Sequence, residues 1–171
     1  MQQLNGEVWQ PPLQSAYKLN FDAVVFSSLD KLGFGAIIRN EKGEVMATMT
    51  TSGPKVSRSD EAEMLACRRA IEFAVDVGFS RLIIKGYNVN VIQAISSPLA
   101  NNSLLGNVVD DICHLIHGLQ WASICCIRRS GNKVAHVLAQ YARNTLDEDL
   151  YWMEDSPPPA VKALYQDTLL I

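Results

Sequence analysis

The sequence predicts an α/β domain in which a mixed sheet is flanked by helices. Residues 17–27 alternate apolar and polar side chains and then run apolar, and two further strand segments follow by residue 52 through short links, as in an antiparallel meander. From residue 59 the apolar period changes to that of a helix, and short apolar strands then alternate with helices. The 171 residues are 48% hydrophobic, which is enough for a sizeable core.

The first three strands are predicted at 17–27, 32–40 and 45–52. Residues 41–44 read Glu-Lys-Gly-Glu and predict a tight hairpin turn, because glycine accepts a positive φ angle. A helix is predicted from Ser59 to Val77, with Ser59 as its N-cap. Acidic residues fill its first turn, where carboxylates suit the helix dipole.

The second half predicts further strands at 81–86 and 121–128 and helices at 88–97, 103–118, 131–144 and 160–169. The element order is then βββαβααβα, with a five-stranded mixed sheet. The expected organisation is an N-terminal lead-in at 1–16, one domain at 17–146 and a C-terminal tail with a short helix at 147–171.

The net charge of −3 and the pI of about 5.6 argue against strong non-specific nucleic-acid binding, although a local basic face is compatible with them. The cysteine spacing resembles no disulfide framework, so we expect free thiols in a reducing compartment. Neither a signal peptide nor a transmembrane segment is predicted. We therefore expect an intracellular protein, nuclear or cytoplasmic, with no membrane partner.

Five sequence pieces occur in one order along the chain. They are Trp9 with Pro11-Pro12 ahead of Lys18-Leu19-Asn20-Phe21-Asp22, then Gly35 to Asn40 with Gly43, then Ala62-Glu63-Met64-Leu65-Ala66, then Leu82 to Gly86, and finally Arg128 followed by Asn132 to Ala139. In this order they resemble the plant ribonuclease H-like domains of retroelement-derived and stand-alone proteins. The resemblance covers nearly the whole chain.

This resemblance implies a ribonuclease H-like fold and an ancestral activity that cuts RNA in RNA/DNA hybrids. In active members, acidic side chains hold two divalent ions that clamp the attacking and leaving oxygens of a phosphodiester. By position, Asp22, Glu63 and His136 match catalytic and metal-binding residues. A neutral imidazole at 136 suits Zn or Mn better than Mg.

The third carboxylate position departs from the family. Members usually have an aspartate after the fourth strand, and Tyr87 replaces it here. Asn88 is a poor substitute, and Lys85 places an ammonium group where an acid is usual. Arg128 to Gly131 replaces the longer loop that carries a general-acid histidine in bacterial-type enzymes. We predict that two-metal hydrolysis is lost or severely impaired, with no cofactor expected and Mg²⁺ or Mn²⁺ required for any residual activity.

Three functions stay open on the sequence. The first is a pseudo-nuclease retained for binding RNA/DNA hybrid or RNA, or for protein interaction. The second is a weak ribonuclease that uses Asp22, Glu63, Asn88 and His136. The third is a protein-interaction module. The residues expected to contact nucleic acid are Arg39, Arg128, Arg129, Asn132 and Lys133.

A zinc site is a further alternative, because Cys113 and His117 share a helical face. Cys125 and Cys126 would point to opposite sides of their strand, so free thiols fit the spacing better.

Overall fold

The computed structural model describes residues 8–13, 15–97, 105–145 and 147–169. Its strands are β1 (Tyr17–Phe26), β2 (Lys31–Arg39), β3 (Val45–Pro54), β4 (Arg81–Gly86), β5 (Trp121–Cys126) and β6 (Leu150–Met153). Its α-helices are α1 (Ser59–Asp76), α2 (Val89–Ser96), α3 (Gly106–His117), α4 (Lys133–Tyr141) and α5 (Pro158–Thr168). The predicted lead-in and the predicted helix at 103–118 lie partly outside the described residues.

The strands form one mixed sheet in the order β5-β4-β1-β2-β3-β6. β1 pairs antiparallel with β2 and parallel with β4, and β4 pairs parallel with β5. The mixed sheet confirms the predicted fold class. β6, which pairs antiparallel with β3, is a sixth strand that the sequence analysis left inside the C-terminal tail.

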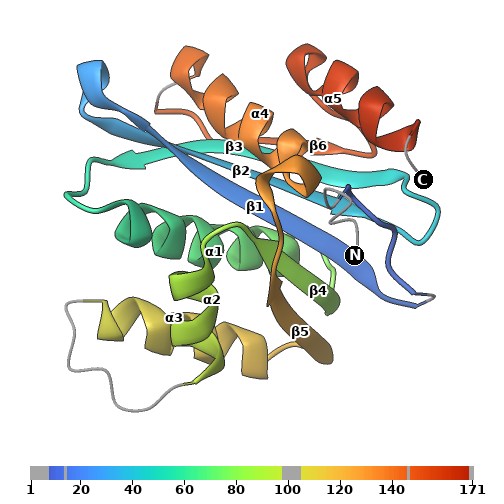
Figure 1. Ribbon diagram of the computed structural model, residues 1–171, viewed down its shortest axis with the longest axis horizontal. Coiled ribbons are helices and arrows are strands. Elements are labelled where there is room, and N and C mark those ends of the chain that lie inside the picture. Colours follow the sequence, from blue (N-terminus) through green and yellow to red (C-terminus); the bar gives the residue numbers. More distant parts are fainter. Residues whose placement is uncertain (1–7, 14, 98–104, 146, 170–171) are drawn as a thin grey trace, which may run out of the picture.

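Two helical layers cover the sheet, as Figure 1 shows: α1, α2 and α3 lie on one side, and α4 and α5 lie on the other. The larger core lies between the sheet and α1, with side chains such as Leu19, Phe21 and Phe73. A smaller core joins Ile37 to Val134 and Leu138 of α4 and to α5. The segment 147–171 thus supplies one strand of the sheet and part of this second core.

Glycine on β2 sets how closely α4 approaches the sheet. A Cβ atom at Gly35 would overlap the backbone of Ala135 and Ala139 on α4. The absent side chain lets α4 lie directly on the strand, and this fixes the position of residues on the inner face of α4 relative to β1.

Local details refine the predicted boundaries. Gly43 has a φ of 79° in the predicted hairpin turn, and Gly78 has a φ of 93° after α1. Ser59 is the first residue of α1 rather than its N-cap; Arg58 holds the cap position, and its side chain does not cap the helix. The helix predicted at 131–144 is α4 between two 3₁₀ turns, Arg129–Gly131 and Ala142–Asn144.

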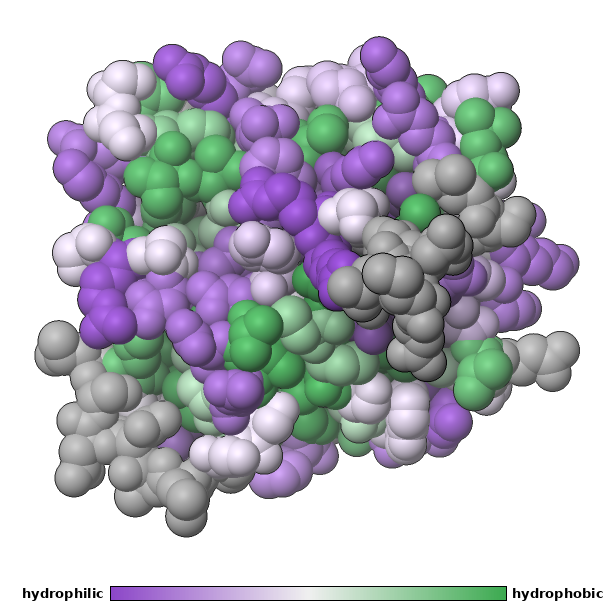
Figure 2. Space-filling model, viewed as in Figure 1, coloured by the Kyte–Doolittle hydropathy of each residue, from purple (hydrophilic) through white to green (hydrophobic). Residues whose placement is uncertain are grey.

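The surface mixes residue types. Figure 2 shows hydrophilic and hydrophobic residues interspersed over the face seen in Figure 1. None of the helices in the described part of the chain has the length and hydrophobicity that a membrane span requires.

Candidate functional site

Asp22 lies on the central strand β1 and is 3% exposed. Side chains alternate along a strand, so Leu19 and Phe21 join the core against α1. Asn20 and Asp22 share the opposite face, where they meet residues of the α4 segment. A buried carboxylate needs polar partners, and the structure supplies one from α4.

His136 of α4 is that partner. Its Nδ1 atom lies 2.8 Å from Oδ2 of Asp22. The two side chains form a hydrogen bond in which the tautomer of the imidazole decides which atom donates. The bond fixes the orientation of the ring, and the side chain is 28% exposed. The structure therefore brings together two of the three predicted catalytic residues through a direct contact.

Glu63 enters the site from α1 and is 8% exposed. Its Oε1 atom accepts a hydrogen bond of 3.3 Å from the backbone N–H of Ala23. Its Oε2 atom is buried with no hydrogen-bond partner among the described residues. Burial, and after it the charge of the nearby Asp22, raise the pKa of Glu63 to about 9, against weaker lowering by Ala23 N–H and Arg129. Glu63 therefore holds its proton at neutral pH.

A chain of buried amides holds the start of α4 against β1. Trp9 Nε1 donates to Asn20 Oδ1 at 3.1 Å, and Asn20 Nδ2 donates to Asn132 Oδ1 at 3.0 Å. Asn132 Nδ2 in turn donates to the backbone carbonyl of Phe21 at 2.9 Å. Asn132 is 2% exposed, so it positions the fold from inside, and this burial argues against the nucleic-acid contact predicted for it.

One signal in the sequence points to this amide chain. Asn20 is a polar residue between apolar neighbours of a central strand, and such a buried amide requires a partner.

Tyr87, which the sequence analysis placed at the third carboxylate position, is 42% exposed just after β4. The guanidinium carbon of Arg129 lies 4.7 Å from the centre of its ring, in a cation–π contact. Asn88 has a structural role, because its Oδ1 accepts from the N–H groups of Asn90 and Val91 and caps α2. The amide oxygen of Asn88 is thus occupied by the helix.

The basic residues predicted to contact nucleic acid divide into two groups. Arg39 is 1% exposed and forms an ion pair of 2.7 Å with Asp167 of α5, which argues against the nucleic-acid contact predicted for it. Arg128, Arg129 and Lys133 are exposed beside the start of α4. The two groups differ in burial, which cannot be read from residue type alone.

The predicted metal ligands do not present a converging set. Among the described residues, no group of three or more His, Cys, Asp or Glu side chains is arranged to hold a metal ion. Nδ1 of His136 is directed at Asp22, and Oε1 of Glu63 is directed at the backbone. Two divalent ions prefer several ionised oxygen ligands, so the residues present do not fit them.

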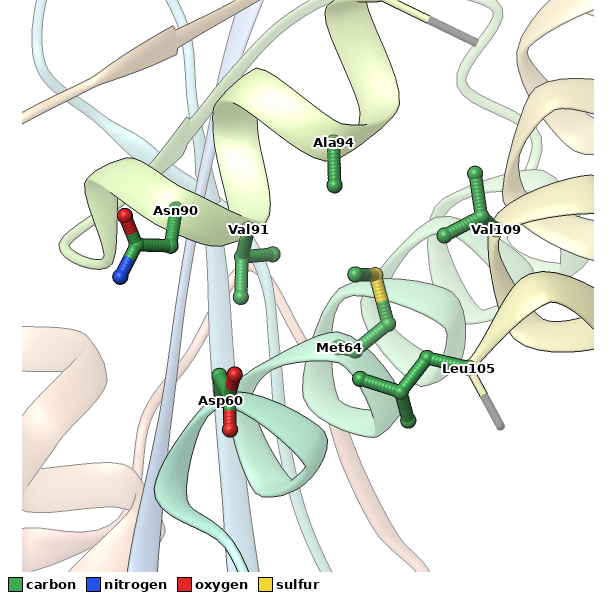
Figure 3. Close-up of a pocket in the computed structure, with 7 residues that line it drawn as sticks. All are labelled: Asp60, Met64, Asn90, Val91, Ala94, Leu105 and Val109. Atoms are coloured by element: carbon green, nitrogen blue, oxygen red, sulfur yellow. The ribbon is translucent and has the colours of Figure 1, made fainter. Parts of the chain in front are cut away.

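Within the described ranges there is likewise no zinc site, and the four cysteines form no disulfide with one another. A small hollow of about 60 Å³ lies between α1, α2 and α3, and its lining residues suggest no catalytic or metal-binding role. Figure 3 shows that its lining is mainly apolar, with Met64, Val91 and Val109 around it and Asp60 and Asn90 as its polar members.

Comparison with solved structures defines the class of protein. Ribonuclease H1 from Halobacterium salinarum is similar with a TM-score of 0.68 and 21% identity, over 76% of this chain and 98% of that protein. The N-terminal ribonuclease H domain of a Mycobacterium tuberculosis protein has a TM-score of 0.66 at 16% identity, over 76% and 94% of the two chains. LC11 ribonuclease H1, in complex with RNA/DNA hybrid, has a TM-score of 0.66 at 17% identity, over 75% and 97%. This chain therefore has the ribonuclease H-like fold.

The family follows from the sequence itself. The model of the reverse transcriptase-like family matches residues 20–142, which span the strands and helices that carry Asp22, Glu63 and His136. The chain belongs to the reverse transcriptase-like family. None of the curated proteins matches it in sequence.

Proposed function

We propose that this domain is a ribonuclease H-like pseudo-nuclease that binds RNA/DNA hybrid or RNA without cutting it by a two-metal mechanism. The observation that carries the proposal is the contact of Arg129 with Tyr87, with 4.7 Å between the guanidinium carbon and the ring centre. By the register of the motif, Tyr87 stands where active members of the resembled family carry an acid, and the positive Arg129 packs on its ring.

The electrostatics of the site support this proposal. The charge of Arg129 favours the ionised form of Glu63, as a bound cation would. The positive charge of Arg129 also disfavours a divalent ion nearby, although solvent at this exposed side chain screens the repulsion. By the register of the motif, the carboxylate set is thus weakened by the absence of an acid at Tyr87.

The surface beside the site fits nucleic acid. Tyr87 and Arg128 line a hollow of about 320 Å³ whose other walls are Val89, Cys126 and Ile127. An aromatic ring beside basic side chains can stack an unpaired base while the cations neutralise backbone phosphates. The hybrid-bound state of LC11 ribonuclease H1, a protein with the same fold, is consistent with such a partner.

Salt-dependent binding of a labelled hybrid tests the binding half of the proposal. Wild-type affinity should fall steeply as salt rises, because cations at the surface displace counterions. Lys133→Gln should reduce the salt slope by about 1. Lys162→Gln, on the exposed face of α5, is the matched control and should leave the slope unchanged. Absent binding, or binding that ignores salt, would refute a nucleic-acid role.

Tyr87→Asp tests the catalytic half. Restoring a carboxylate should allow Mg²⁺-dependent cleavage of the hybrid above the wild-type rate. Tyr87→Phe keeps the ring for contact with Arg129 and should give no gain. If Tyr87→Asp also gives none, residue 87 alone does not explain the expected inactivity.

The two other functions have less support. A weak manganese-dependent ribonuclease would need the Asn88 oxygen, which caps α2. A protein-interaction role is favoured by exposed apolar side chains on β6 and α5, namely Met153, Val161, Tyr165 and Leu169. Hybrid binding that is absent at all salt concentrations would favour this second role.

A further inference from the structure

A small pocket on the α4 side of the sheet is lined by two lysines and lies apart from the carboxylates. Its volume is about 120 Å³, and its lining consists of Val8, Gln10, Lys18, Lys85 and Ile127. Asn20 pairs with Lys85 between β1 and β4, and Lys18 lies two residues earlier on β1. Side chains alternate along strands, so both lysines extend to the same face of the sheet.

The charge of this pocket is unbalanced. Lys18 is 6% exposed, and neither lysine forms an ion pair with a residue that the structure describes. Arg39 adds a third positive charge near Lys18, but Asp167 already neutralises it. Burying a cation without a counter-charge is costly, and two neighbouring cations increase the cost.

The contacts that partly compensate the charge of Lys18 come from neutral groups. Lys18 Nζ donates a hydrogen bond to the backbone carbonyl of Gln10, and it lies 5.4 Å from the centre of the Trp9 ring. Burial first, and then the charges of Lys85 and Arg39, lower the pKa of Lys18 to about 8. A lysine ammonium has three donors, so further donors of Lys18 remain for a ligand.

We propose that this pocket binds a phosphate group through Lys18 and Lys85. An oxyanion would supply the missing negative charge and accept hydrogen bonds from both ammonium groups. The pocket volume of about 120 Å³ exceeds the roughly 30 Å³ that one water occupies in the liquid, so a group larger than one water can enter it. The phosphate comes either from a polynucleotide backbone or from a free phosphate or phosphomonoester. The site does not depend on the function proposed above, because inorganic phosphate alone tests it.

The direct test is amine acylation of the full chain, mapped by peptide, with and without inorganic phosphate at constant ionic strength. Phosphate should slow the acylation of Lys18 and Lys85 and leave the exposed Lys162 unaffected. Equal rates at Lys18 and Lys85 with and without phosphate would overturn the proposal.

Calorimetric titration with inorganic phosphate gives an independent measure. Lys85→Met should weaken binding about tenfold, the worth of one hydrogen bond to a charged group. Lys162→Met is the control and should bind as the wild type does. Lys85 is only partly buried, so its variant keeps the test valid if Lys18→Met does not fold. Unchanged binding in Lys85→Met would also overturn the proposal.

A third arm distinguishes the sources of phosphate. If inorganic phosphate competes with a labelled hybrid and Lys85→Met weakens hybrid binding, the site holds a backbone phosphate. If phosphate protects both lysines while hybrid binding is absent or unchanged, the site holds a free phosphate or phosphomonoester. Either result supports the site, and the second leaves it standing even where the proposed nucleic-acid function fails.

Discussion

Replacing Glu63 with glutamine reveals how the buried carboxyl pair is protonated. The pKa of Glu63 is raised to about 9 by burial and by Asp22, from an ordinary value of 4.5. Between these values the folded chain keeps a proton that the unfolded chain releases, so the free energy of unfolding falls as pH rises. A pH of about 7 is roughly 2.5 units above the pKa of the unfolded chain. The protonation of Glu63 therefore lowers the free energy of unfolding at that pH by about 3 kcal/mol.

Glutamine cannot titrate, but it retains a carbonyl oxygen that can accept from Ala23 N–H. The two proteins should therefore unfold with similar free energies near about pH 4, where Glu63 is neutral in both states. Glu63→Gln should then become the more stable protein as pH rises, by about 3 kcal/mol near about pH 7.

Urea unfolding followed across this pH range measures the difference between the two proteins. Other groups titrate in both proteins, so their contributions cancel in the difference. Parallel stability curves for wild type and variant would show that Glu63 is ionised in the folded state. That result would refute the claim that Glu63 is protonated in the folded protein at neutral pH.

Three substitutions test how the fold positions the site. Gly35→Ala should destabilise the protein by about 1–3 kcal/mol, because the added methyl group forces α4 off the sheet. Gly118→Ala is the control and should be tolerated, because its added atom meets nothing nearer than 3.4 Å. Equal thermal unfolding temperatures of the two variants would contradict the close packing of α4 on β2. Asp167→Asn leaves the charge of Arg39 buried and unbalanced and should cost about 3–5 kcal/mol in urea unfolding; a loss within error would show that the pair is not buried. Asn132→Ala breaks the amide chain and should lower the free energy of unfolding by about 1–3 kcal/mol. It should also shift the imidazole NMR signals of His136. Unchanged signals would contradict the positioning role of Asn132.

Sequence pattern predicted the elements with strong periodicity. The alternation along β1 and the helical period of α1 located Asp22 and Glu63 on the elements that hold them. β6 was missed because its four residues, Leu150–Met153, are too few for a clear alternation. Its position depends on pairing with β3, which is distant in the sequence.

The roles of polar residues were harder to predict, because they depend on burial. Arg39 and Asn132 have the side chains of nucleic-acid contacts, yet tertiary packing places both inside the protein. The position of Tyr87 in the motif led to the prediction of a missing carboxylate, whereas its contact with Arg129 joins residues distant in the sequence and could not be predicted. Lys85 was expected near the cation position, and the structure places it with Lys18 in a pocket that the sequence analysis did not predict. The pairing register of β1 and β4 brings the two lysines together, and this register cannot be predicted from the spacing of residues in the sequence.

Cleavage of a labelled RNA/DNA hybrid by the purified wild type tests the central claim most directly. The assay compares the wild type with Asp22→Asn in Mg²⁺ and in Mn²⁺, because Asp22 is the carboxylate on which any metal-dependent reaction at this site would rely. With Tyr87 and Arg129 in place of an anionic ligand, both proteins should leave the hybrid intact at equal background rates. Robust metal-dependent cleavage by the wild type that disappears in Asp22→Asn would contradict the proposed loss of two-metal hydrolysis.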